Sequence, residues 1–199
     1  MYRDSLIFTL MIIALLITSS ACLSDNFQKG LDASQKGDYS TAIKEWTPLA
    51  KQGDSDAQYA LGAMYFAGYG VSQNYHTAVK WYTLAAEQGN SNAQFNLGVM
   101  YGKGQGVSQN FKTAMKWYTL AASQGNALAQ FNLGLMHNRG HGVSKDQVRA
   151  HMWLNLSALT GHKKAAKLRD IVAENLTDRS LSDAQKFAQE CIEKNYKDC

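Results

Sequence analysis

Residues 102–110, GKGQGVSQN, contain the residue types of a phosphate-binding loop, because glycine amides and a lysine can surround an anion. A nucleotide-binding P-loop, however, requires G-x-x-x-x-G-K followed by Ser or Thr, and here Gly104 follows Lys103. The stretch also recurs as AGYGV (67–71) and RGHGV (139–143), in which only glycine and valine are kept. Two glycines around one variable residue are typical of a helix end and a tight turn. We therefore interpret this segment as a turn between helices.

Two histidines have a sequence spacing that is also found in metal sites. His137 and His141 are four residues apart, as are two zinc ligands on one helix. The glutamate of an H-E-x-x-H site is missing from HNRGH, and tyrosines take the place of His137 in the related upstream segments. The serines of the recurring turn have no His or Asp partner at a regular spacing: Ser72, Ser108 and Ser144. We therefore expect no metal, no cofactor and no catalytic residue.

The N-terminus has the three-part pattern of a secretory signal. Arg3 precedes an uncharged apolar run at residues 6–18, and small residues follow at 19–22. An apolar run of 13 helical residues reaches only about 20 Å, which is short for a membrane span. We therefore predict a signal peptide at residues 1–21 and an exported protein. An uncleaved signal anchor is the alternative.

The cysteines indicate whether the exported protein is anchored to a membrane by a lipid. Cys22 ends the stretch SSAC, which resembles the lipobox of bacterial lipoproteins, except that Ser19 stands where leucine is typical. Lipidation would make Cys22 the first mature residue and leave Cys191 and Cys199 as an even pair, able to form a disulfide in an oxidising compartment. Cleavage by ordinary signal peptidase is the alternative. We predict a periplasmic protein, with a lipidated Cys22 as its anchor to the outer membrane.

Composition and charge limit the class of partner. The chain has 199 residues, one proline and a formal net charge of +4, and 45% of its residues are hydrophobic. These proportions favour a folded and mainly helical protein. The basic residues are scattered apart from a cluster at 163–169, without a basic face studded with aromatic residues. Nucleic acid is therefore not expected as a ligand.

A repeat organises most of the chain. Residues 74–109 align with residues 110–145 at an offset of 36, and further steps extend the series in both directions. The copies are 38–73, 74–109, 110–145 and a diverged 146–170. Terminal units of such an array expose their outer faces to water. We therefore predict a capping helix pair at 26–52 and a capping helix with a tail at 171–199.

Each unit contains two predicted helices. In the second copy, one helix runs over 75–88 and stops at Gly89, and its apolar face consists of Ala78, Tyr82, Ala85 and Ala86. The next helix continues to about Lys103, and its predicted cap is Asn90 or Asn92. Its buried face holds Ala93, Leu97 and Tyr101, with Gly98 allowing a neighbouring helix to approach closely. Because one pair cannot bury its apolar faces alone, the units must stack into a solenoid.

The motifs of this unit resemble a known family. AQFNLGVMY (93–101), GKGQGV (102–107) and KTAMKWYTLAASQG (112–125) are similar to the motifs of the Sel-one-like repeat family, which is related to the tetratricopeptide repeats. The resemblance covers residues 38–170. It implies an all-α fold, a right-handed superhelix of stacked antiparallel helix pairs, which the family uses as a protein–protein interaction scaffold.

The second helix of each pair carries a stripe of residues on the flank opposite Ala93, Leu97 and Tyr101. The resemblance places these helices on the inner, concave surface of the superhelix. Asn amides can hold an extended peptide backbone, methionine adapts to varied side chains, and Lys or Arg can bind a carboxylate. The predicted protein-binding residues are Asn92, Asn96, Met100, Lys103, Asn132, Met136 and Arg139. The alternative is that these side chains are solvated or packed between helices.

These observations favour a non-enzymatic scaffold or adaptor of the bacterial cell envelope, which binds a protein or peptide on its concave face. Membrane contact is expected only through a lipid on Cys22. Two alternatives stay open. One is an envelope enzyme that acts on cell-wall material or binds a β-lactam, and the other is a structural lipoprotein without a dedicated ligand.

Overall fold

The computed structural model describes residues 25–197 and residue 199. The predicted signal peptide, the lipobox-like stretch and Cys22 lie outside these residues. In the described part of the chain, none of the helices has the length and apolar character that a membrane span requires.

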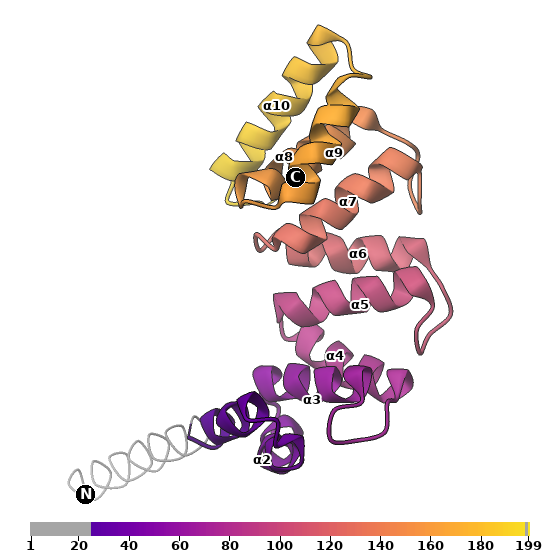
Figure 1. Cartoon of the computed structure of the whole chain (residues 1–199). Helices are drawn as coiled ribbons and strands as arrows, with labels where there is room; N and C mark the ends of the chain where they lie inside the picture. Colours follow the sequence, from indigo (N-terminus) through magenta and orange to yellow (C-terminus); the bar gives the residue numbers. More distant parts are fainter. Residues whose placement is uncertain (1–24, 198) are drawn as a thin grey trace, which may run out of the picture.

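The described residues form an elongated stack of helices (Figure 1). A helix over residues 25–35 leads into the stack. The helices that follow it are α2 (Tyr39–Lys51), α3 (Ser55–Ala67), α4 (Tyr75–Glu87), α5 (Ser91–Lys103), α6 (Phe111–Ala122), α7 (Ala127–Arg139), α8 (Gln147–Leu159), α9 (Lys163–Ala173) and α10 (Asp178–Glu193). The most extensive contacts join α3 with α4, α5 with α6, and α7 with α8. The predicted all-α stack of helix pairs with a 36-residue repeat is therefore confirmed.

Side chains cap the helices at their start. From α2 to α8, each helix follows an Asp or Asn whose side chain accepts a hydrogen bond from the backbone N–H three residues later. Asn90 takes this role for α5, so that Asn92 remains exposed on the first turn. At their other ends, α3, α5 and α7 stop at glycines with left-handed backbone: Gly68, Gly104 and Gly140.

The glycine-rich segment 102–110 is a helix end and a turn, as predicted. Gly104 has a φ of 71°, and its backbone N–H donates to the carbonyl oxygen of Met100. Gly106 has a φ of 72° and lies against the start of α4, where an added β-carbon would be 2.5 Å from the carbonyl carbon of Tyr75. Backbone conformation and close packing therefore account for both glycines, with no need of a bound anion.

Small residues bring the paired helices together. Gly98 on α5 faces Tyr118 on α6, and a β-carbon at Gly98 would lie 2.5 Å from the tyrosine ring. The predicted close approach at Gly98 is therefore confirmed. Ala93 and Leu97 are fully buried, whereas Tyr101 is half-buried. The predicted apolar face of α4 is also buried: Ala78, Tyr82, Ala85 and Ala86.

Buried glutamines link successive repeats, a feature that the sequence analysis did not predict. The side-chain amide of Gln94 donates to the carbonyl oxygen of Ala86 at 3.0 Å. Its Oε1 accepts from Nε2 of Gln124, one repeat unit further along, at 2.8 Å. Gln58 makes the equivalent bonds in the preceding repeat. Because an unpaired buried amide costs about 1–3 kcal/mol, this ladder allows polar side chains inside the stack.

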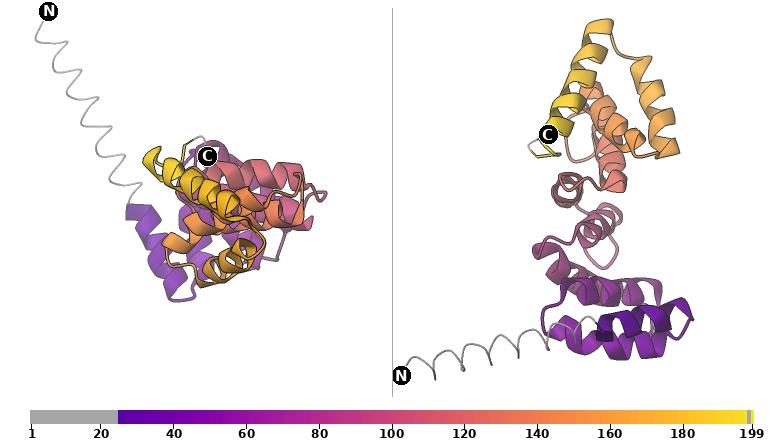
Figure 2. Two further views of the ribbon diagram at one scale, coloured as in Figure 1. Left: turned by 90° about the horizontal axis from the view of Figure 1, so that it is seen from above. Right: turned by 90° about the vertical axis from the view of Figure 1, so that its left-hand side faces the viewer.

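The C-terminal end departs from the regular stacking. Helix α9 packs on α8, and α10 also lies against α8, so that α8 has neighbours on several sides (Figure 2). Ala188 and Cys191 of α10 join the core cluster that contains Leu156 of α8. Cys191 and Cys199 form a disulfide in the structure, with their Cα atoms 5.2 Å apart. This bond joins α10 to the end of the tail.

A candidate binding face on alternate helices

The predicted stripe residues lie on α5 and α7, which we call A helices together with α3 and the helix over residues 25–35. We call α2, α4, α6 and α8 the B helices. The surface that the A helices present is the A-helix face. Two grooves are hollowed in this face, and each one lies where two successive A helices meet above the B helix between them.

The second groove lies between α5 and α7, has a volume of about 350 Å³, and includes four of the seven predicted binding residues. Lys103 comes from α5, and Asn132, Met136 and Arg139 come from α7. The other lining residues are Val99, Gly102, Phe111, Ala114, Tyr118, Leu135 and His141. The floor is therefore mainly apolar, and the polar groups lie along the two bordering helices.

Two cations border the second groove. Lys103 and Arg139 are exposed in the last turns of α5 and α7. Among the described residues, neither forms a salt bridge or a side-chain hydrogen bond. Both side chains are consequently available to an anionic group.

The groove floor is closed by Tyr118, whose side chain is only 5% exposed. Burial raises the pKa of Tyr118 well above its usual range, so that its phenol remains neutral. Asn132 donates from its Nδ2 to the carbonyl oxygen of Leu128 at 2.8 Å, which leaves its Oδ1 to accept from a ligand. The groove thus combines apolar contact, a hydrogen-bond acceptor and positive charge.

Three predicted residues lie elsewhere. Met100 is fully buried in the core that α4 and α5 share, so that the structure corrects its assignment as a surface residue of the stripe. Its neighbours α4 and α6 cover it, and it contributes packing. The side chain of Asn96 acts to lower the pKa of Tyr82, although burial dominates and raises the pKa of that phenol. Asn92 is exposed and lines the other groove.

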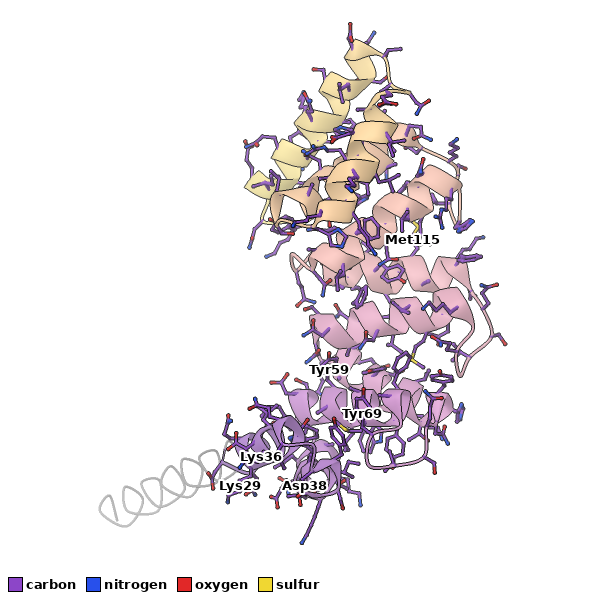
Figure 3. All side chains as sticks on the ribbon, in the orientation of Figure 1. Lys29, Lys36, Asp38, Tyr59, Tyr69 and Met115 are labelled. Atoms are coloured by element: carbon purple, nitrogen blue, oxygen red, sulfur yellow. A yellow bond between two sulfur atoms is a disulfide. The ribbon has the colours of Figure 1, made fainter. Side chains whose placement is uncertain are left out.

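The first groove lies between the helix over residues 25–35 and α3, with a volume of about 390 Å³. Its lining is Phe27, Leu31, Trp46, Asp56, Tyr59, Ala60, Ala63, Met64, Asn90 and Asn92. Tyr59, labelled in Figure 3, also packs against Tyr82 with ring centroids 5.8 Å apart. The sequence analysis missed the contribution of Phe27 and Leu31. An alignment of the sequence with itself at an offset of two repeats would have identified these two residues, because they align with Val99 and Lys103.

The two histidines at the zinc-like spacing are separated by burial. His137 is buried in the core, whereas His141 is exposed on the turn and stacks on Phe111 with ring centroids 4.8 Å apart. Tyr69 and Tyr39 make the same contact two repeats earlier, also at 4.8 Å. His141 is therefore a packing residue of the turn. Within the described residues, no group of three or more potential metal ligands comes together.

Comparison with known proteins identifies the repeat. Residues 55–90, 91–126 and 127–162 match the Sel1 repeat, with the same 36-residue period but a start half a unit later than in the copies delineated above. The crystal structure of a Sel1 repeat protein from Oxalobacter formigenes is 30% identical, with a TM-score of 0.72, and the match covers 83% of this chain and 75% of that one. No curated protein matches.

A second solved structure is a protective antigen present in uropathogenic Escherichia coli strains, which displays an SLR fold. It is 28% identical with a TM-score of 0.54, and the match covers 87% of this chain. The chain spans about half of that protein, since 47% of it is covered.

Proposed function

We propose, since the chain belongs to the Sel1 repeat family, that it is a non-enzymatic scaffold that binds an extended segment of a partner protein on its A-helix face. The observation that carries this proposal is the second groove. There, Lys103 and Arg139 border an apolar floor without ion-pair partners among the described residues. Such a mixture suits a peptide, whose side chains need apolar contact and whose charges and amides need partners.

We further propose that this scaffold acts in the bacterial cell envelope. Support comes from the signal-like pattern of residues 1–21 and the lipobox-like stretch that ends at Cys22. Mass spectrometry of the mature protein tests this location. A diacylated N-terminal Cys22 is expected, and an intact N-terminus that begins at Met1 would contradict both signal cleavage and the lipid anchor at Cys22.

Site-specific photo-crosslinking in the native cells tests the binding face. A photoreactive amino acid at Leu135, in the second groove, should yield one discrete crosslinked partner. The same probe at Leu120, exposed on the B helix α6, serves as the control and should yield none. Substitution of Lys103→Gln together with Arg139→Gln should remove the crosslink from Leu135.

A matched charge control accompanies this experiment. Lys80→Gln with Lys116→Gln removes the same two positive charges from exposed positions on the B helices and should leave the crosslink intact. Equal labelling from Leu135 and Leu120, or no discrete partner at either position, would contradict the proposed face and favour a structural protein without a dedicated ligand.

A further inference from the structure

The two grooves occupy equivalent positions of the repeat, and they are two repeats apart. A shift of two repeats, 72 residues, carries six of the eleven lining residues of the second groove onto lining residues of the first. The matched pairs are Val99 with Phe27, Lys103 with Leu31, Tyr118 with Trp46, Asn132 with Ala60, Leu135 with Ala63, and Met136 with Met64. The repeat has therefore produced two equivalent sites on one face, and their side chains determine what each can accept.

The side chains that line the first groove are less polar and carry less positive charge than those that line the second. The cation Lys103 of the second groove is replaced by Leu31 in the first, and the position of Arg139 corresponds to Ala67. Asn132 is replaced by Ala60, a shorter and apolar side chain. The first groove is thus more apolar than the second and lacks its two cations.

The acidic residue of the first groove reinforces this difference. Asp56 lies at its border and accepts a hydrogen bond from Nδ2 of Asn90 at 2.9 Å. A carboxylate entering the first groove would meet the negative charge of Asp56 and the apolar surface of Phe27 and Leu31. In the second groove it would meet Lys103 and Arg139. Charge complementarity therefore assigns an anionic group to the second groove and a large apolar side chain to the first.

Helix α5 connects the two sites. Its first turn contributes Asn92 to the first groove, and its last turn contributes Lys103 to the second. The helical rise places these two residues about 16 Å apart along the axis. The grooves extend beyond these two residues, to the helix over residues 25–35 on one side and to α7 on the other, so that an extended peptide needs more than about five residues to join them. Asn92 is exposed and can hydrogen-bond to the peptide backbone between the two ends.

We infer that the partner segment is bipartite: it places a large apolar side chain in the first groove and a carboxylate, more than about five residues away, in the second. This inference rests on the proposed function, since it specifies the ligand of the same face. The carboxylate can belong to an Asp or Glu side chain or to the C-terminus of the partner.

Selection from a random peptide library tests this assignment. The purified full chain is presented with peptides of about eight residues, once with free and once with amidated C-termini. We expect enriched peptides to combine a Phe, Leu, Ile, Met or Trp with an acidic group at about the inferred spacing. Enrichment that persists after amidation identifies an acidic side chain, and enrichment only of free acids identifies a C-terminus.

Two substitution pairs separate the grooves. Lys103→Leu with Arg139→Ala gives the second groove the residues of the first and should weaken binding of a selected peptide about tenfold or more, with loss of the acidic preference. Ala63→Leu introduces the side chain found at the matched position Leu135, reduces the volume of the first groove, and should weaken only the apolar preference. Both variants use residues that the stack already accepts at equivalent positions, so that the fold should be retained.

Exchange of the two sets gives the strictest test. Leu31→Lys with Ala67→Arg, added to the pair at the second groove, should reverse the order of apolar and acidic residues in the selected peptides. Selection of peptides without this paired pattern would overturn the bipartite ligand while leaving a peptide-binding scaffold in place. Absence of any enriched peptide from the unaltered protein would overturn both the inference and the proposed function.

Discussion

The hydrogen bonding of buried polar side chains differs between the stacked repeats and the C-terminal end. In the repeats, Gln94 has both a donor and an acceptor partner, because Gln124 of the next repeat reaches its Oε1. Gln130 is the same residue one repeat later, but Thr160 occupies the position of Gln124 and does not reach it. The Oε1 of Gln130 is therefore left without a partner, and its amide bond to Ala122 is long, at 3.4 Å.

Among the residues that the structure describes, two buried histidines near the C-terminal end also have a ring nitrogen without a hydrogen-bond partner. His137 replaces the tyrosine found in the earlier repeats, and His151 replaces Met115, the equivalent residue of α6 that Figure 3 labels. Both imidazoles are buried, and the Nδ1 of each lacks a hydrogen-bond partner among the described residues. The buried amides of Gln58 and Gln94 have a partner in the next repeat. Near the C-terminal end, where the pattern diverges, Gln130, His137 and His151 each have a buried polar atom that lacks a partner in the described part of the chain.

The largest expected effect concerns the close helix contact inside a repeat. Gly98→Ala should lower the free energy of unfolding by about 2–3 kcal/mol, because the added methyl meets the buried ring of Tyr118. Gly134→Ala, at the matched position near the C-terminal end, should cost less, since the methyl meets mainly the flexible side chain of Leu154. Urea unfolding of both variants measures the difference.

Gly102→Ala is the control for this comparison. An added β-carbon there finds no atom closer than 3.8 Å, so that the variant should match or slightly exceed the stability of the unaltered protein. An equal loss at Gly98, Gly134 and Gly102 would contradict the role of the close contact, because helix propensity alone predicts a gain in stability at all three positions.

A smaller effect is expected from the glutamine ladder. Gln94→Ala should cost about 2 kcal/mol, because the substitution leaves the carbonyl oxygen of Ala86 and the amide of Gln124 without their partner. Gln130→Ala removes a side chain with one unsatisfied oxygen and one long bond, and should cost about 1 kcal/mol or less. Thermal unfolding of the two variants tests the order, and a greater loss for Gln130→Ala would contradict it.

The smallest expected effect is a pH dependence that arises at the C-terminal end. Burial lowers the pKa of His137 and His151; Asp146 and Arg149 face the first, and Arg169 and Asp170 the second. The unfolded chain then binds more protons than the folded chain below the ordinary histidine pKa of about 6.5. Stability should therefore fall as the pH drops below this value towards the lowered folded-state pKa.

Two substitutions locate the source of this pH dependence. His137→Tyr and His151→Met restore the residues of the second and third repeats, respectively, at these positions. The double variant should lose less stability than the unaltered protein between pH 7 and about pH 5.5 in denaturant titrations. An unchanged slope would assign the dependence to other groups. His76→Gln, at an exposed histidine, is the control and should leave the slope unaltered.

Much of the fold follows from the sequence by local rules. The offset of 36 residues identifies the repeat, Asn90 and Gly104 mark the start and end of α5, and Gly98 marks a close contact. Each of these signals depends on a few neighbouring residues, so that no long-range information is needed. The exposure of Lys103 and Arg139 could be predicted in the same way, from their position in the last turn of an A helix.

What the sequence determined by itself is which positions are equivalent, because identical spacing places residues at the same point of each helix pair. Only the tertiary structure decided what these equivalent residues do. Asn96 and Asn132 are the same residue at the same position, yet the first influences the pKa of Tyr82, whereas the second donates to the carbonyl oxygen of Leu128 and lines a groove. Met100 is fully buried, whereas Met136, 6% exposed, lines a groove. The reason is that the space around a repeated residue depends on the side chains of the neighbouring helices, which differ from one repeat to the next.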